Sequence, residues 1–312
     1  MAFISIIVGI VLLIKGGDWL MRSAVSLSLR QNIPKIVIGM TVVSFATSAP
    51  ELIVSIRSAL LGHPDLALGN VIGSNIANLG LVLAITIMIS PIRVNYNFYK
   101  TDWPMMISAT ILFFIFILFD YNLSSLEGAV MFIVLICFLL YLIFFQKETV
   151  VDEISENVNI LTYTQITYYL IVGGFSLWLG SETLIKGAVT LAIDNGVSER
   201  IISISIISIG TSIPELSASV IAVINKEKAI SIGNLIGSNI FNLLAVLGIT
   251  SIIAPVNVID MGLVYNDIWW MLGISLLILP LVFIFKRNIL SRIEGLILLT
   301  VYFMFIYPLI SG

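Results

Sequence analysis

The feature that most constrains this chain is a series of apolar stretches, each about long enough to cross a lipid bilayer. Hydrophobic residues make up 59% of the 312 residues and charged residues only 11%, whereas a soluble domain carries about 25% charged residues. A transmembrane helix needs roughly 20 apolar residues. The sequence therefore predicts an all-α integral membrane protein with ten transmembrane helices, at residues 1–23, 34–61, 66–90, 103–119, 124–145, 164–191, 199–225, 229–254, 267–286 and 290–310.

The joins between these stretches differ in their content of basic residues. Most lysines and arginines fall in the odd-numbered joins, and only Arg57, Lys186 and Arg200 fall in the even-numbered ones. Because cytoplasmic joins are enriched in lysine and arginine, we expect the odd joins to be cytoplasmic and both termini to lie outside a cell membrane. The net charge of −3 gives no reason to expect a nucleic-acid partner.

One region of the chain occurs twice. SFATSAPEL at 44–52 returns as SIGTSIPEL at 208–216, and GNVIGSNIAN at 69–78 returns as GNLIGSNIFN at 233–242. Equivalent positions are 164 residues apart in both motifs. Each predicted half has five helices, and because five is odd, the second half must enter the membrane upside down. Such an inverted repeat is typical of secondary transporters, which bind cargo near the midplane between the halves.

This repeat predicts the domain organisation. We expect a first five-helix repeat at 1–145 with its motif region at 39–83, and a second repeat at 164–312 with its motif region at 203–247. Between them, residues 146–163 form a predicted cytoplasmic linker whose acidic run DEISE is typical of a solvated connection.

Each copy of the first motif places polar side chains beside a proline. Pro50 and Pro214 lack an N–H group and disfavour helical geometry in the preceding residue, so we expect the second and seventh helices to be broken or kinked there. The freed carbonyls would lie beside hydroxyl and carboxylate oxygens, a set that suits calcium. The candidate ligands from this motif are Thr47, Ser48, Glu51, Thr211, Ser212 and Glu215.

The second motif supplies the other wall of the predicted site. Its paired glycines, four residues apart, would let a neighbouring helix approach closely, and its polar residues follow the same helical spacing. With one histidine and one cysteine in the chain, zinc and copper are disfavoured. The candidate ligands here are Ser74, Asn78, Ser238 and Asn242, whereas Asn75 and Asn239 are expected to support them or to join helices.

The two glutamates carry the strongest functional signal. A charged side chain at the bilayer centre costs at least about 2.5–3.5 kcal/mol, so a repeated pair is expected to bind cations, whereas prolines and glycines are also common in packing alone. Asp18 is followed four residues later by Arg22, a spacing that predicts an ion pair within one helix. Glu182 and Lys186 repeat this spacing, and neither pair is expected to bind cargo.

Together, the paired motifs (G/A)TSxPE and GNxIGSNIxN resemble the two alpha-repeats of the calcium/cation antiporter superfamily, in the form found in short prokaryotic sodium/calcium exchangers. The resemblance covers essentially the whole chain. It implies that Glu51 and Glu215 bind calcium together with main-chain oxygens near the two motif threonines. It further implies that neighbouring serines and asparagines help to bind sodium, and that the first and sixth helices slide to alternate access.

The charge of the predicted site indicates obligatory exchange. Two ionised glutamates without a cation cannot be closed off from water without a large desolvation cost, so only a loaded transporter is expected to cross between its inward and outward states. Three sodium ions against one calcium, as the resemblance implies, would move net charge. We expect no enzyme activity and no cofactor; the partners are calcium, sodium and the bilayer, and one chain should suffice for transport.

The sequence is also compatible with other transport functions. Burial disfavours the charged form of a carboxylate, so protons are the main alternative counter-ion, in a proton/calcium or other divalent-cation antiporter. A cation channel could line its pore with glutamates, but would conduct without a counter-ion. A sodium-coupled carrier of organic solutes is a weaker alternative, because the predicted site has acids and amides but no cationic partner.

Overall fold

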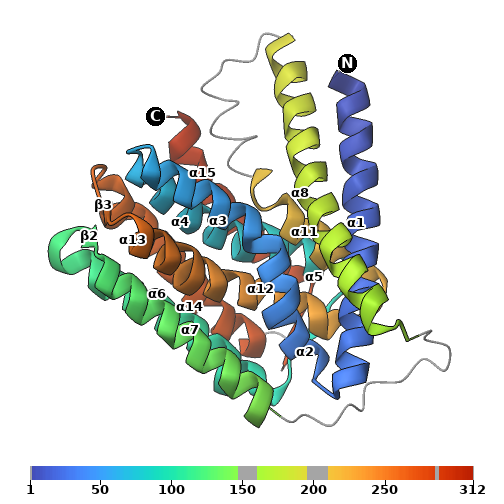
Figure 1. The fold of residues 1–312 in the computed structure, drawn as a ribbon. Coiled ribbons are helices and arrows are strands. Elements are labelled where there is room, and N and C mark those ends of the chain that lie inside the picture. Colours follow the sequence, from blue (N-terminus) through green and yellow to red (C-terminus); the bar gives the residue numbers. More distant parts are fainter. Residues whose placement is uncertain (1, 147–159, 195–209, 285–287, 312) are drawn as a thin grey trace.

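The structure is a computed structural model of the chain, and it describes residues 2–146, 160–194, 210–284 and 288–311. This part of the protein is nearly all helical (Figure 1). Seven of its helices have the length and apolar composition to cross a membrane. An integral membrane protein is therefore confirmed, whereas the count of ten helices and the division into two inverted domains stay predictions.

Short joins connect the helices of the first half, and the segments labelled η are π-helical. They are α1 (Ala2–Gln31); α2, η1 and α3 (Lys35–Ile38, Gly39–Val43 and Ser44–Leu60); α4, η2 and α5 (Pro64–Ala77, Asn78–Leu83 and Ala84–Ile89); η3 and α6 (Phe98–Asp102 and Trp103–Asp120); and α7 (Ser125–Phe145).

The second half repeats this order as far as it is described. Its helices are α8 (Tyr163–Asp194); α11 (Ile213–Ile224); α12, η5 and α13 (Lys228–Phe241, Asn242–Leu247 and Gly248–Ile253); η6 and α14 (Leu263–Asp267 and Ile268–Ile284); and α15 (Arg292–Ser311). The greater part of the predicted linker, and the start of the predicted seventh helix, lie outside the described residues.

Three helix boundaries differ from the sequence prediction. The first helix continues to Gln31 instead of ending at 23, and the fourth and ninth begin earlier, at Phe98 and Leu263. An apolar-length criterion stops at charged residues, but a helix continues wherever packing covers it, and Ala24 and Ser28 are fully buried. Arg30, which falls in the predicted first join, therefore lies in the last turn of α1.

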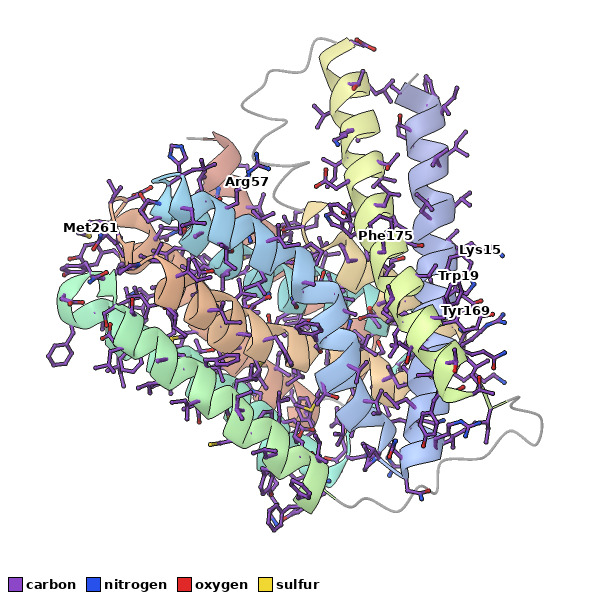
Figure 2. All side chains as sticks on the ribbon, in the orientation of Figure 1. Lys15, Trp19, Arg57, Tyr169, Phe175 and Met261 are labelled. Atoms are coloured by element: carbon purple, nitrogen blue, oxygen red, sulfur yellow. The ribbon has the colours of Figure 1, made fainter. Side chains whose placement is uncertain are left out.

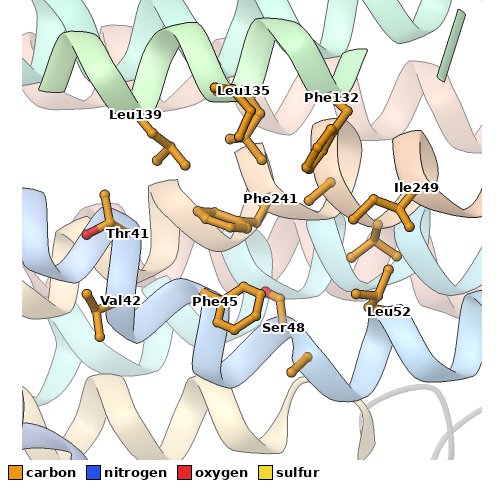
Figure 3. Close-up of a pocket in the computed structure, with 14 residues that line it drawn as sticks. Thr41, Val42, Phe45, Ser48, Leu52, Phe132, Leu135, Leu139, Phe241 and Ile249 are labelled. Carbon is orange, nitrogen blue, oxygen red and sulfur yellow. The ribbon is translucent and has the colours of Figure 1, made fainter. Parts of the chain in front are cut away.

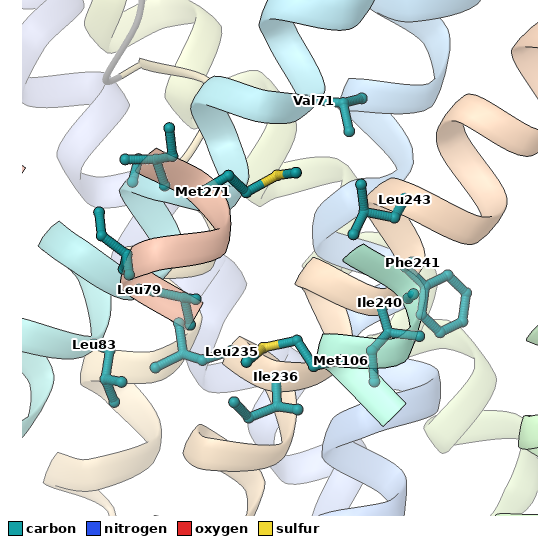
Figure 4. Close-up of a cluster of buried hydrophobic side chains, with 14 of the residues drawn as sticks. Val71, Leu79, Leu83, Met106, Leu235, Ile236, Ile240, Phe241, Leu243 and Met271 are labelled. Carbon is teal, nitrogen blue, oxygen red and sulfur yellow. The ribbon is translucent and has the colours of Figure 1, made fainter. Parts of the chain in front are cut away.

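The helices that carry the GNxIGSNIxN motif form the centre of the molecule. In the span Pro64–Ile89, 72% of the most apolar window is buried, and in Lys228–Ile253 the share is 83%, compared with 28% for α1 and α7. Both helices contribute to the main hydrophobic cluster, part of which is drawn in Figure 4. The repeated polar motif is therefore enclosed by protein on most sides.

Two pairs of short antiparallel strands tie the joins together. β1 (Ile92–Arg93) pairs with β4 (Ile289–Leu290), and β2 (Asn122–Leu123) pairs with β3 (Val256–Asn257). In the predicted ten-helix order, the first pair links the third and ninth joins and the second pair links the fourth and eighth. Odd joins therefore meet odd joins and even joins meet even joins, as expected for a chain that alternates across a membrane.

α1 and α8 lie side by side and are inclined to the other helices (Figure 1). Glycines allow their backbones to touch: a Cβ added at Gly16 would lie 2.9 Å from Gly173 O, and one at Gly180 would lie 3.0 Å from the main-chain oxygen of Gly9. On the outer side of this pair the rings of Trp19 and Tyr169 stack, with centroids 6.5 Å apart (Figure 2). The two helices thus pack as one unit.

Local structure repeats between the halves. The π-helical segments η2 and η5 occupy equivalent positions immediately after the two motif helices. The N-terminus of α7 is closed by Ser124 and Glu127, whose Oε2 accepts from Ser124 N at 2.8 Å, and Ser291 and Glu294 make the same contact at α15, at 2.7 Å. The repeat seen in the sequence therefore extends to helix caps and helix irregularities.

Candidate functional site

The second helix is not broken at Pro50, so the predicted break was wrong there. α3 continues from Ser44 through Pro50 to Leu60, and the irregularity lies earlier, in the π-helical segment η1. A proline removes only one backbone donor, and neighbouring helices and hydroxyl groups can compensate within a membrane. At the η1 irregularity, Ser44 Oγ lies 2.8 Å from Gly39 O and 3.0 Å from the main-chain oxygen of Asn234.

The seventh helix has a discontinuity next to Pro214. Thr211 and Ser212 form a turn, and α11 begins at Ile213. Pro214 falls in the first turn of α11, where a missing N–H group is not needed for an intrahelical bond. Thr211 is half-buried and Ser212 is buried, so the turn carries two candidate ligands.

Glu51 and Glu215 are both fully buried and interact electrostatically with each other. Neither carboxylate oxygen of Glu51 has a hydrogen-bond partner in the described part of the chain. Ser48 Oγ donates to Glu215 Oε1 at 3.4 Å, and Glu215 Oε2 has no such partner among the same residues. Tertiary structure thus brings together two acids that lie 164 residues apart and leaves their oxygens available.

Thr47 links the second helix to α12. Its side chain is fully buried, and Oγ1 lies 3.2 Å from Asn234 Oδ1 and 3.3 Å from Ser238 Oγ. The candidate ligands Thr47 and Ser238, predicted from different motifs, are therefore direct neighbours.

Thr47→Val keeps the shape of this side chain and removes its hydroxyl group. We expect the half-saturating calcium concentration for uptake into vesicles to rise about 3- to 10-fold, the usual effect of losing one hydrogen bond or ligand of this kind. Thr110→Val is the matched control, because Thr110 is also buried and, among the described residues, its hydroxyl donates within its own helix, to Met106 O at 2.9 Å. Similar shifts in both variants would contradict a role for Thr47 in the site.

The serines and asparagines of the second motif meet between α4 and α12. Asn242 Nδ2 donates to Ser74 Oγ at 3.1 Å and to Asn75 Oδ1 at 3.2 Å. Asn78 is fully buried, and within the described ranges neither of its side-chain polar atoms has a hydrogen-bond partner. Asn242 and Asn78, which the sequence makes equivalent, therefore have different surroundings.

The acceptors without a partner share one chemistry. Among the candidate ligands, these acceptors are Glu51 Oε1 and Oε2, Glu215 Oε2, Ser212 Oγ, Asn78 Oδ1 and Asn242 Oδ1. Leaving a buried polar group unsatisfied costs about 1–3 kcal/mol each, whereas oxygen acceptors are the ligands of hard cations. The described residues contain no group of three or more histidine, cysteine, aspartate or glutamate side chains that could hold a metal ion, so the acidic charge of this site is that of two carboxylates.

Close helix contact at the glycines is confirmed for the second copy of the motif. A Cβ added at Gly233 would meet Ile36 O, and one at Gly237 would lie 2.6 Å from Met40 Cα. In the first copy, Gly69 meets only Leu263, at 3.7 Å, and Gly73 meets nothing within 4 Å among the described residues. The equivalent partner segment, 200–208, lies outside them, so close packing there stays a prediction.

Each half also contains one supporting asparagine–serine pair that was not predicted from the sequence. Asn70 Nδ2 donates to Ser55 Oγ at 3.2 Å, and Asn234 Nδ2 donates to Ser219 Oγ at 3.1 Å. Each serine stands four residues after the motif glutamate, on the same helix face. This spacing and its repetition could have revealed both pairs.

The predicted intrahelical ion pairs are confirmed. Arg22 Nη2 lies 2.9 Å from Asp18 Oδ2, and Lys186 Nζ lies 3.5 Å from Glu182 Oε2. These carboxylates are on α1 and α8 and already have cationic partners.

A cavity of about 430 Å³ lies beside the site, between α3, α7 and α12 (Figure 3). Its walls are almost entirely apolar and include Phe45, Phe132 and Phe241, and neither glutamate lines it. Ser48, which also contacts Glu215, lies at its edge. An apolar cavity cannot replace the hydration shell of a cation, so the ion site is the buried polar cluster and not this space.

The family model described as sodium/calcium exchanger protein matches residues 1–144 and 166–310. The chain belongs to the sodium/calcium exchanger family. Members of this family are membrane antiporters and not enzymes. The match leaves out only the region of the predicted linker and the extreme C-terminus, so both halves of this exchanger-family protein are recognised.

Relatives and solved structures agree with the membership. The exchanger-family chain is 39% identical over 318 residues to CaxA of Alkalimonas amylolytica, a candidate antiporter, with 100% of this chain and 99% of CaxA covered. It is 27% identical to the sodium/calcium exchanger MaX1 of Methanosarcina acetivorans, with 98% of each chain covered. A solved structure of the sodium-calcium exchanger NCX_Mj superposes with a TM-score of 0.83 at 26% identity, covering 99% of this chain and 98% of that one.

Proposed function

We propose that this cation antiporter exchanges calcium for sodium across a cell membrane by alternating access. The observation that carries the proposal is the buried pair of Glu51 and Glu215, which interact with each other while three of their four oxygens have no hydrogen-bond partner among the described residues. Calcium binds oxygen ligands and is neutralised by two carboxylates. The relatives named as sodium/calcium exchangers support the choice of ions.

The proposed architecture is two inverted repeats of five helices, 1–145 and 164–312, around a linker at 146–163. The paired strands, the equivalent π-helical segments and the repeated helix caps support it. Both chain ends lie at the same end of the molecule (Figure 1), which an even number of membrane crossings requires. From the distribution of basic residues, we place this end outside the cell.

The proposed site combines both motifs of both repeats. Calcium would be held by the glutamates and by oxygens around the two threonines, and sodium by the hydroxyl and amide oxygens. The proposed ligand set is Thr47, Ser48, Glu51, Ser74, Asn78, Thr211, Ser212, Glu215, Ser238 and Asn242. Ser48, which bridges to Glu215, and Thr47, which contacts Ser238, support a set shared between the halves.

The charge of the site explains why exchange would be obligatory. An empty site would hold two negative charges away from water, which is strongly unfavourable, so the closed transporter must carry calcium or sodium. Three sodium ions for one calcium would make each cycle move one net charge, and a potential of 100 mV would then contribute about 2.3 kcal/mol. The tightly packed pair of α1 and α8 is the unit that we expect to slide.

The experiment that tests this function is uptake of radioactive calcium into vesicles of the purified protein. Vesicles are loaded with sodium and diluted into sodium-free buffer at one pH, beside identical vesicles that carry only a proton gradient. We expect uptake to require internal sodium and to increase when the interior is made positive, because three sodium ions leaving for one calcium ion entering carry one net positive charge outward. Uptake driven by protons alone would identify a proton/calcium antiporter, and uptake without any counter-ion gradient would identify a channel.

A further inference from the structure

The two asparagines that the repeat makes equivalent, Asn78 and Asn242, are held differently. Both N–H groups of Asn242 are in use, one on Ser74 Oγ at 3.1 Å and one on Asn75 Oδ1 at 3.2 Å. Two donor bonds from one planar amide fix its orientation. The remaining atom, Asn242 Oδ1, is buried with no hydrogen-bond partner among the described residues, and it is the atom that a cation can bind.

Asn75 is itself fixed in position. Its Nδ2 donates to the main-chain oxygen of Asn239 at 3.4 Å and lies 3.7 Å from Met271 Sδ. Met271 belongs to the buried cluster shown in Figure 4, and the Asn75 side chain is only 2% exposed. Because backbone and packing both hold Asn75, its Oδ1 is a stationary acceptor for the Asn242 amide.

The corresponding network of the other half is not formed. Symmetry would pair Asn78 Nδ2 with Ser238 Oγ and Asn239 Oδ1. Ser238 Oγ instead lies 3.3 Å from Thr47 Oγ1, and in the described part of the protein neither Asn78 nor Asn239 Oδ1 has a hydrogen-bond partner. Residues of the same type at equivalent positions are therefore arranged differently in the two halves. Asn75 accepts a hydrogen bond from Asn242, whereas Asn239 accepts none from Asn78.

From this asymmetry we infer that Asn75 is a positioning residue for the cation site. It orients Asn242 so that the carbonyl oxygen of the amide, and not its NH₂ group, faces the transported cation. Without Asn75 the amide can rotate, and its positive edge then repels a cation. The inference rests on the proposed function in one respect, namely that Asn242 belongs to the cation site.

The test is equilibrium binding of radioactive calcium to the purified protein, which does not require transport. We expect Asn75→Ala to raise the dissociation constant about 3- to 10-fold, as for the loss of one hydrogen bond. Asn75→Leu, which also removes the acceptor but keeps the volume of the side chain, should give the same shift if the alanine variant folds poorly. Asn239→Ala is the matched control and should bind calcium nearly as the wild type does.

A double-mutant cycle separates positioning from packing. In an Asn242→Ala background there is no amide to orient, so Asn75→Ala should add no further loss of affinity. Additive losses, an equal loss in Asn239→Ala, or a wild-type protein that binds no calcium would each overturn the inference. A protein that binds calcium but fails the vesicle assay would reject the proposed exchange and leave the role of Asn75 supported by its own cycle.

Discussion

Replacing Glu51 or Glu215 by glutamine will reduce sodium-driven calcium uptake by at least about 100-fold. Each substitution keeps the size of the side chain and an amide oxygen but removes one of the two charges of the site. A unit-charge pair at 4 Å is worth about 4 kcal/mol at an effective dielectric constant near 20, which corresponds to two to three orders of magnitude in affinity. Both glutamates are fully buried, so bulk water cannot replace the lost interaction.

The control for these variants is Glu182→Gln. Glu182 occupies the interior of α8 but is paired with Lys186 and partly exposed, so its neutralisation should leave calcium uptake close to that of the wild type. Yield and thermal unfolding in detergent show whether each variant is folded. Full transport by a folded Glu51→Gln and by a folded Glu215→Gln would reject the assignment of the site.

Gly233→Val is expected to cause the largest loss of stability. Gly233 lies where α12 crosses the second helix, and the two backbones are in direct contact there. A Cβ on Gly233 would meet Ile36 O and lie 3.1 Å from Met40 N. A Cβ on Gly39 would lie 2.5 Å from Ile230 O. Backbone atoms of a packed helix cannot move aside as a side chain can. Overpacking of this kind costs about 1–3 kcal/mol or more, so we expect a clearly lower melting temperature and a lower yield of folded protein.

The control is Gly273→Val on α14. This substitution has the same cost in helix propensity, but Gly273 is exposed and a Cβ there meets nothing within 4 Å among the described residues. Melting of both purified variants in the same detergent, followed by tryptophan fluorescence, compares them directly. Equal melting temperatures would show that the crossing of the second helix and α12 tolerates extra volume.

The sequence predicted which residues form the site better than it predicted the backbone geometry of the site. The repeat identified Glu51 and Glu215, and the structure buries both and leaves most of their oxygens without partners. The proline rule, however, predicted a break or a kink at Pro50, and α3 is continuous there. A propensity rule considers one residue in isolation, whereas the irregularity of this helix formed in η1, where Ser44 Oγ contacts Gly39 O and the main-chain oxygen of Asn234 on the neighbouring helix.

Other features depended on the spatial arrangement of segments distant in sequence. Ser55 and Ser219 were not predicted to support the site, since a serine in an apolar helix is ordinary until its partner asparagine is located. The end of α1 was placed too early because apolar length measures contact with lipid, and residues 24–31 are covered partly by protein.

The sequence by itself determined a membrane protein, a duplicated motif and the chemistry of its oxygen ligands, because apolar length, periodicity and residue type are properties of the chain alone. Only the tertiary structure decided which residues at equivalent sequence positions also make equivalent contacts. Asn78 and Asn242 have the same sequence neighbourhood, but Asn242 is held by Ser74 and Asn75 while Asn78 is not held in this way. The physical reason is that a hydrogen bond depends on the placement of two groups, and helices far apart in the sequence provide that placement.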